Sequence, residues 1–322
     1  MIQVLETGVS TTVQDSGRYG HYHIGMPPSG ALDQFAHEAA NYLVGNDADA
    51  ATLEMTYQGP DLLFEEDTVV AVTGADMSHT LEGEPIPPWT AVEVEAGDTL
   101  STGFATEGVR SYLAVAGGID VEPVMGSRST YTLIGIGGFE GRALEPDDRL
   151  PVGEHGDRSD AVGNSVDESR WPDYTDDTIR VVMGLCAYRL SEDGRERFLG
   201  ADWKVSDESD RVGYRFEGPD IQDMFVEREQ PFGAGPDVTN VVDLGYPVGS
   251  IQMAGQPIAL TRDAVTGGGY ATVATIISPD RDALSQCRVH STVNFEAVDV
   301  DEALEARAER DATLETIRES LS

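Results

Sequence analysis

The segment Asp263-Ala264-Val265-Thr266-Gly267-Gly268-Gly269-Tyr270 brings an acidic side chain, hydroxyl groups and a run of glycines into one short stretch. Glycines let the backbone turn sharply and come close to a ligand. A second polar, glycine-containing block, Ser209-Asp210-Arg211-Val212-Gly213-Tyr214-Arg215, lies upstream. We interpret the two blocks as a pair that carries the chemistry of the protein.

Outside these blocks the chain is dominated by short segments rich in β-branched and aromatic residues. The clearest are residues 69–72, 91–94, 111–115, 179–182 and 292–295, each bounded by Gly, Pro or Asp. Such a composition, with Gly, Pro or Asp at both ends of each segment, is typical of short strands. The sequence therefore predicts a mainly β protein.

Helices are predicted in few places. Asp33 is expected to cap a helix that buries Phe35, Ala36, Ala39, Ala40 and Leu43 and ends near Gly45, because these apolar residues share one helical face. Ser278 followed by Pro279 suits an N-cap and first turn, which predicts a short helix through Gln286. The charged segment 299–322 predicts a terminal helix.

The apolar pattern stops between residues 151 and 177, where Gly, Ser, Asp and Glu dominate. We predict an acidic linker or a long surface loop there. A chain of 322 residues favours two domains. The expected division is one subdomain over 1–150 and another over 178–298, followed by the terminal helix.

The charge of the chain restricts its partners. The 58 acidic and 21 basic residues give a net charge of −37, while 40% of residues are apolar, which predicts a folded core rather than disorder. Such a surface is best tolerated at molar salt, where screening acts within about 3 Å. We expect a salt-adapted protein of haloarchaeal type that binds neither nucleic acid nor membrane. The apolar runs are too short for a membrane span and we see no secretory signal, so we expect a cytoplasmic location.

Metal and redox chemistry have little support in the sequence. Cys186 and Cys287 are predicted to be buried thiols, and His21, His23 and His37 to be surface or core histidines, because none has ligand spacing. The P-loop pattern is absent, and so is a lysine between methionines that would accept biotin. We therefore predict no metal site, and any biotin would arrive on another protein.

A third block and a series of shorter motifs complete the pattern. The third block is Gln14 to Gly20 followed by Ser29 to Asp33, and the shorter motifs are 40–46, 53–56, 72–75, 112–118, 126–130 and 255–258. In order and spacing the set resembles the biotin-dependent carboxyltransferase family. That family includes the C subunit of 5-oxoprolinase, the second allophanate-hydrolase-like subunit and the carboxyltransferase part of urea carboxylase. The resemblance implies two related β-barrel subdomains of cyclophilin-like type, called A and B.

The resemblance also implies chemistry on a small amide or lactam, which needs donors for charge that develops on a carbonyl oxygen. Arginine suits a carboxylate or a phosphate because its guanidinium binds with a planar fork. We expect Arg211 to be catalytic and Arg18, Arg128 and Arg215 to bind substrate; ion pairs with neighbouring carboxylates are the alternative.

Asp263 is the expected acid or base, and Tyr270 the third catalytic residue. A simple turn cap remains the alternative for Asp263. The remaining expected substrate-binding residues are neutral hydrogen-bonding groups or glycines that permit close approach: Ser129, Tyr214, Gln252, Gln256, Thr266, Gly268 and Gly269.

Three functions follow from the resemblance. The first is a subunit of an ATP-dependent complex that opens 5-oxo-L-proline to L-glutamate, active only with a homologous subunit-B-like partner and a LamB-type lactam-hydrolase subunit, with which it would share ATP. The second is carboxyl transfer to urea or another small amide, with biotin on a separate protein. The third is a regulatory binding subunit that inhibits a partner.

Overall fold

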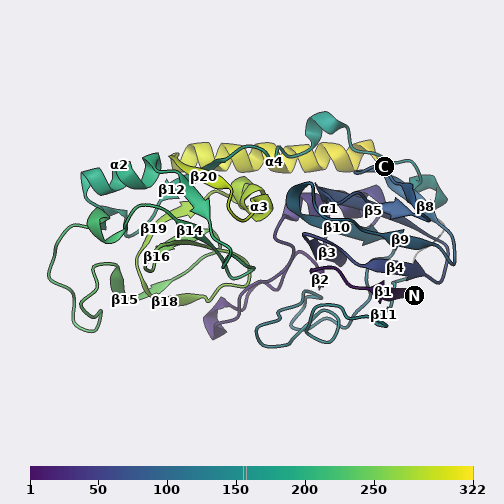
Figure 1. Cartoon of the computed structure of the whole chain (residues 1–322), viewed down its shortest axis with the longest axis horizontal. Coiled ribbons are helices and arrows are strands. Elements are labelled where there is room, and N and C mark those ends of the chain that lie inside the picture. The colour runs from purple at the N-terminus through teal and green to yellow at the C-terminus, as the bar shows by residue number, and fades with distance from the viewer. Residues whose placement is uncertain (155, 157, 322) are drawn as a thin grey trace. The chain divides into compact units, whose positions relative to one another are not determined.

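The computed structural model describes residues 1–154, 156 and 158–321. The chain forms two compact units (Figure 1). Unit 1 contains Met1–Arg18, Ser29–Tyr174 and the chain from Asp311. Unit 2 contains Tyr19–Pro28 and Thr175–Arg310.

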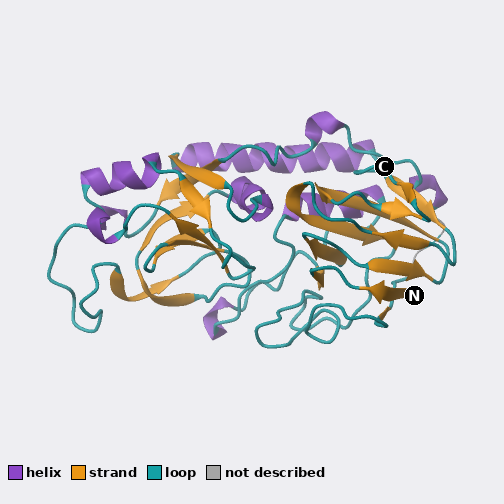
Figure 2. Cartoon of the chain, in the orientation of Figure 1, coloured by secondary structure: helices purple, strands orange, loops and turns teal. Residues whose placement is uncertain are grey.

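The strands of unit 1 form two antiparallel sheets, drawn as orange arrows in Figure 2. The first has the order β11 (Arg149–Leu150), β1 (Ile2–Glu6), β4 (Asp61–Phe64), β9 (Thr99–Ser101), β6 (Thr80–Leu81) and β7 (Glu84–Pro85). The second has the order β2 (Ser10–Gln14), β3 (Thr52–Thr56), β10 (Glu107–Val115), β5 (Thr68–Asp76) and β8 (Ala91–Val94).

The second sheet is buried on both faces. Along β5, Val70 and Val72 belong to one hydrophobic cluster, whereas Val69 and Ala71 belong to another. Successive side chains of a strand point to opposite faces, so the two-residue period of the strand separates the clusters. The first cluster also contains Val4 and other residues of the first sheet, and the second contains the buried face of α1.

Helix α1 (Gln34–Leu43) forms as predicted. Asp33 is its N-cap and accepts a 2.9 Å hydrogen bond from the backbone N–H of Ala36. The five apolar residues expected to share a face are all buried, and Gly45 has the positive φ of 72° that suits a chain leaving a helix.

Unit 2 contains a closed barrel of seven strands. Around the barrel the order is β12 (Thr178–Met183), β19 (Thr272–Ile276), β16 (Ser250–Met253), β17 (Pro257–Leu260), β14 (Gly213–Glu217), β13 (Trp203–Val205) and β20 (Thr292–Ala297). Its core contains Trp203, Phe198 and Phe295, whose rings lie 5.1–6.5 Å apart between centroids. Strands β15 (Asn240–Gly245) and β18 (Gly267–Tyr270) form a separate pair.

The other helices are α2 (Glu192–Gly200), α3 (Ser278–Gln286) and α4 (Val300–Ser320). Helix α3 corrects one prediction, because Ile277 and not Ser278 is the residue before the helix, and Ser278 and Pro279 form its first turn. None of the helices in the described residues is long and apolar enough to cross a membrane.

The mainly β fold is confirmed, with a closed barrel in unit 2 and two sheets in unit 1 where a second barrel was expected. The division between the units lies at Tyr174 and Thr175, and Tyr19–Pro28 joins unit 2. Much of the predicted linker packs on unit 1, where Ala161 and Val166 are buried. Residues 155 and 157 of that segment, and residue 322, lie outside the described residues.

Unit 2 contains the lysine and both cysteines of the sequence. Lys204, the one lysine of the sequence, lies on β13 with its Nζ 3.8 Å from Glu217 Oε2. Cys186 is buried as predicted, whereas Cys287 is only partly buried. Desolvation still raises the pKa of the Cys287 thiol to about 12, so Cys287 stays protonated at neutral pH.

Candidate functional site

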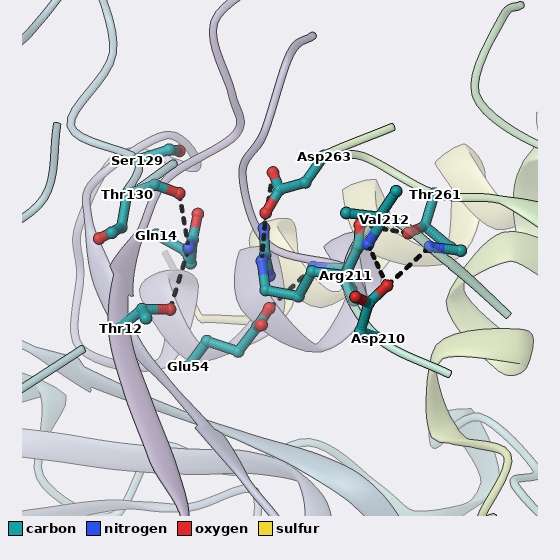
Figure 3. A network of polar contacts seen from close by, with 12 residues as sticks. Thr12, Gln14, Glu54, Ser129, Thr130, Asp210, Arg211, Val212, Thr261 and Asp263 are labelled. Atoms are coloured by element: carbon teal, nitrogen blue, oxygen red, sulfur yellow. Dashed lines mark hydrogen bonds and ion pairs between the residues drawn. The ribbon is translucent and has the colours of Figure 1, made fainter. Parts of the chain in front are cut away.

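The two polar blocks of unit 2 meet through an ion pair. Arg211 Nε lies 2.8 Å from Asp263 Oδ2, and the two side chains point toward each other in Figure 3. The Asp263 carboxylate is 4% exposed and the Arg211 side chain 16%. The pairing of the blocks, inferred from sequence, therefore exists as a direct contact.

Backbone contacts reinforce this ion pair. The N–H of Asp263 donates to the carbonyl of Arg211 at 3.0 Å, and the N–H of Thr261 donates to the carbonyl of Val212 at the same distance. The Thr261 hydroxyl also donates to the Arg211 carbonyl. Asp210 in turn accepts from the N–H of Val212 at 2.8 Å, as Figure 3 shows. The turn after β17 is thus fixed to the loop before β14.

That turn carries Arg262 and Thr266 into a cavity of about 630 Å³, within the range of roughly 300–1,000 Å³ for small-molecule sites. Three tyrosines, two prolines and two arginines contribute to its walls. The lining residues are Tyr19, Tyr22, His23, Pro28, Gly245, Tyr246, Pro247, Val248, Arg262, Thr266 and Arg281. All of them belong to unit 2.

The two arginines of the cavity are held in different ways. Arg262 Nη2 donates to the Tyr19 hydroxyl at 2.9 Å, and its guanidinium carbon lies 5.6 Å from the Tyr19 ring centroid, a cation–π distance. Arg281 Nε donates to the Ile276 carbonyl at 3.1 Å. Burial lowers the pKa of Arg281, and the positive charge of Arg262 acts in the same direction. The Arg281 guanidinium still stays charged at neutral pH.

Two tyrosines of the cavity are neutral donors at physiological pH. Burial raises the pKa of Tyr22 and of Tyr246 above the usual value. The Tyr246 hydroxyl donates to the Tyr270 carbonyl at 3.0 Å and accepts from the Tyr270 N–H at 2.7 Å. These two hydrogen bonds hold the end of β18 against Tyr246, which lines the cavity.

The predicted residues of the 263–270 block have different roles around the cavity. Thr266 lines it, whereas the Tyr270 side chain does not; the Tyr270 backbone is hydrogen-bonded to the hydroxyl of the lining residue Tyr246. A Cβ at Gly268 would lie 2.9 Å from the Tyr246 ring, so Gly268 permits the close approach of β18 to that ring. Gly269 has more room, because its nearest neighbour is the Val241 carbonyl oxygen at 3.4 Å.

The other predicted residues of unit 2 are elsewhere. Tyr214 is buried in the barrel core, where its hydroxyl donates to the Ser285 carbonyl at 2.9 Å. Arg215 lies on β14 and donates its N–H to the Ser209 hydroxyl at 3.0 Å. Gln252 lies on β16, and the Gln256 carbonyl accepts from the Ala254 N–H in the turn that follows.

The predicted residues of unit 1 support its loops. Arg18 is 1% exposed and donates from Nε to the Val124 carbonyl at 2.9 Å and from Nη2 to the Ser129 carbonyl at 2.8 Å. The Ser129 hydroxyl donates to Asp15, and Arg128 pairs with Asp120 at 3.0 Å. Within unit 1, Figure 3 also shows Gln14 donating to the Thr12 hydroxyl and to the Thr130 carbonyl.

Sequence reasoning missed Tyr19, Tyr22, Tyr246, Arg262 and Arg281 as site residues. Arg262 adjoins Asp263, and Tyr19 belongs to the Gln14 to Gly20 block, so both had a local signal. Arg281 had none, because it lies on α3 and reaches the cavity only through tertiary packing. No group of three or more His, Cys, Asp or Glu in the described part of the chain could hold a metal ion.

Comparisons with known proteins agree with this fold. Residues 24–297 match the family model described as carboxyltransferase domain, subdomain A and B. The chain is 37% identical to the 5-oxoprolinase C subunit of Escherichia coli strain K12 over 98% of this chain and 97% of that protein. It is 31% identical to urea amidolyase of Saccharomyces cerevisiae, of which it spans 18%. The crystal structure of Kluyveromyces lactis urea carboxylase superposes with a TM-score of 0.90 at 32% identity, and the chain spans 29% of it.

Proposed function

The chain belongs to the family of carboxyltransferase domains with subdomains A and B, and on this basis we propose that it is a subunit of an ATP-dependent 5-oxoprolinase complex. The reaction would open 5-oxo-L-proline to L-glutamate. The observation that carries the proposal is the 37% identity with a 5-oxoprolinase C subunit along almost the full length of both chains.

The side chains of unit 2 suit part of such a reaction. The substrate is a lactam that bears a carboxylate, and an arginine-containing cavity favours an anion. The neutral Tyr22 hydroxyl can donate a hydrogen bond without adding negative charge, whereas the Tyr246 hydroxyl already donates to the Tyr270 carbonyl and contributes its ring. In the proposed role, these residues bind and orient the ring.

The chemical step needs groups beyond this cavity. Asp263 is bound to Arg211, so we assign the ion pair a positioning role for the turn that carries Arg262.

ATP would supply activation of the lactam carbonyl as a phosphorylated intermediate. The sequence lacks a P-loop, so we place ATP at a site shared with a partner subunit. We propose a homologous subunit-B-like protein and a LamB-type lactam hydrolase as the partners, in the cytoplasm.

The test is reconstitution. The chain is purified alone and together with candidate subunits encoded next to it, and glutamate release from 5-oxo-L-proline is measured with and without ATP. We expect release only in the complete mixture with ATP. Turnover by the isolated chain, or none in any mixture, would refute this function.

Carboxyl transfer to urea or another small amide is the second candidate. The superposition on urea carboxylase at a TM-score of 0.90 favours it. Lys204 lies between Trp203 and Val205, so biotin would come on a separate protein. A reconstitution with biotin carboxylase and a biotinylated carrier that consumes carboxybiotin only when urea is added would support this alternative over lactam opening.

A further inference from the structure

Arg281 has an unusual environment for a cation in this chain. Acidic residues outnumber basic ones by 58 to 21, yet among the described residues no carboxylate lies within 4.0 Å of its guanidinium, and the only hydrogen bond is from Nε to the Ile276 carbonyl. The backbone carbonyl therefore fixes the direction of the guanidinium plane. The two Nη groups remain available to a ligand in the cavity.

The cavity that Arg281 lines is positive. None of the described residues that line it is acidic, whereas Arg262 and Arg281 both belong to it. Burial is the main cause of the lowered pKa of Arg281; Asp282 raises that pKa and Arg262 lowers it further. An anion beside the Nη groups of Arg281 would compensate the burial of this guanidinium, and partial exclusion of water would strengthen the attraction between them.

Tyrosines and prolines make up much of the remaining wall. Tyr19, Tyr22 and Tyr246 contribute rings, and Pro28 and Pro247 contribute ring faces of their own. Tyr246 is 3% exposed, while Tyr19 is 61% and Tyr22 38% exposed, so the tyrosine wall extends from the interior to the surface. Aromatic faces bury planar rings with little loss of side-chain entropy.

We propose that this cavity of unit 2 binds a small cyclic carboxylic acid, whose carboxylate accepts hydrogen bonds from the Nη groups of Arg281 and whose ring lies against the tyrosines. The choice of 5-oxo-L-proline as the acid rests on the proposed function. The anion site itself does not, because it follows from the position of Arg281 and from the composition of the cavity.

Ligand-observed saturation-transfer NMR and calorimetry on the full chain test the site. The probes are 5-oxo-L-proline, 2-pyrrolidinone, which has the ring without the carboxylate, and inorganic phosphate, which has charge without a ring. We expect 5-oxo-L-proline to bind at least about tenfold more tightly than either of the others, as charge-assisted hydrogen bonds contribute about that much. Absence of binding, or equal displacement by phosphate, would overturn the proposal.

Variants locate the binding to Arg281. We expect Arg281→Gln to raise the Kd for 5-oxo-L-proline about tenfold or more, and Arg281→Lys to recover part of the affinity because it keeps the charge without the fork. Arg228→Gln is the matched control, because it removes the same charge from an exposed position of the same unit. Thermal melting verifies that each variant is folded. Equal Kd values for Arg281→Gln and Arg228→Gln would refute the assignment.

The reconstituted complex separates this inference from the proposed function. If the isolated chain binds the acid through Arg281 but no mixture releases glutamate, the site stands and the function fails. If the complex releases glutamate and Arg281→Gln leaves its KM unchanged, the function stands and the site fails.

Discussion

At the residue scale, the ion pair between Asp263 and Arg211 fixes the turn that carries Arg262, and this is the positioning role that we propose for it. Asp263 contacts the guanidinium of Arg211, while its neighbour Arg262 lines the cavity. Asp263 and Arg262 are adjacent in the turn after β17. We therefore expect a substitution at Asp263 to shift the backbone of the turn and, with it, the position of Arg262.

We predict that Asp263→Asn lowers both stability and ligand affinity. Asparagine keeps the size but loses the charge that Arg211 contacts, and loss of a charge-assisted hydrogen bond in a buried site costs about 1–3 kcal/mol. Urea unfolding measures the cost. Asp207→Asn, at an exposed position of the loop before β14, is the control and should change stability by less than about 0.5 kcal/mol. Equal effects of the two substitutions would contradict the supporting role of Asp263.

His79 gives unit 1 a dependence on pH. Its side chain is 7% exposed, with Nδ1 3.3 Å from the Thr102 hydroxyl and Nε2 3.1 Å from the Ser111 hydroxyl. Burial lowers the pKa of His79 from 6.5 to about 4, although Asp76 acts in the opposite direction. The folded protein therefore holds this imidazole neutral across the mildly acidic range.

We predict a loss of stability as the pH falls from about 6.5 to about 4. The unfolded chain takes up a proton on His79 in this window and the folded chain does not, so the full stability is present above the window and roughly 2–3 kcal/mol is lost across it. His79→Gln should remove this part of the pH dependence in urea titrations, and the exposed His290→Gln should keep it. An unchanged pH profile in His79→Gln would contradict the prediction.

Residues whose role depends on their neighbours in the sequence were predicted well. Residues whose role depends on tertiary contacts were predicted less well. Short motifs were enough to predict the helix cap at Asp33 and the contact between the blocks 209–215 and 263–270. Tyr214 sits in a polar motif but faces the barrel core, because its position on β14 and not its neighbours decides its direction. Arg281 was missed because only packing brings α3 to the cavity.

At the element scale, strand prediction succeeded because buried strands have a strong composition. All five strand segments proposed from sequence lie within β5, β8, β10, β12 and β20. The order of strands around the barrel depends on pairings between distant segments, such as the parallel pair of β12 and β20. Those pairings leave no local signature in the chain.

Helix α2 contains two glycines with opposite surroundings. A Cβ at Gly194 would lie 2.0 Å from the Met224 carbonyl oxygen, whereas nothing lies within 4 Å of a Cβ at Gly200. We predict that Gly194→Ala destabilises the protein despite the better helix propensity of alanine, because backbone would have to move. Gly200→Ala should be neutral or stabilise by up to about 1 kcal/mol. Chemical denaturation of both variants measures the difference, and similar values would be inconsistent with the close contact at Gly194.

At the scale of the whole molecule, the net charge of −37 is the dominant feature. Arginines such as Arg142 and Arg180 pair with carboxylates, but acidic residues far outnumber them. The excess charge destabilises the compact state through self-repulsion unless salt screens it.

We predict that the melting temperature rises steadily with KCl up to molar concentrations. The Debye length falls from roughly 30 Å at 0.01 M to about 3 Å at 1 M, so repulsion between carboxylates shrinks over this range. Choline chloride at equal ionic strength is the control for specific potassium binding and should act similarly. A melting temperature that does not change from dilute buffer to molar KCl would show that the acidic surface is not a salt adaptation.

The position of Lys204 on β13 makes the chain a convenient object for chemical proteomics. Amine-reactive cross-linkers normally attach at many side chains of a protein, and their products require extensive mapping. Here the only side-chain amine is on one strand of the barrel, with 47% of its side chain exposed. Any cross-link to a partner protein through a side-chain amine of this chain would therefore identify, by mass spectrometry of one peptide, a partner within reach of that strand.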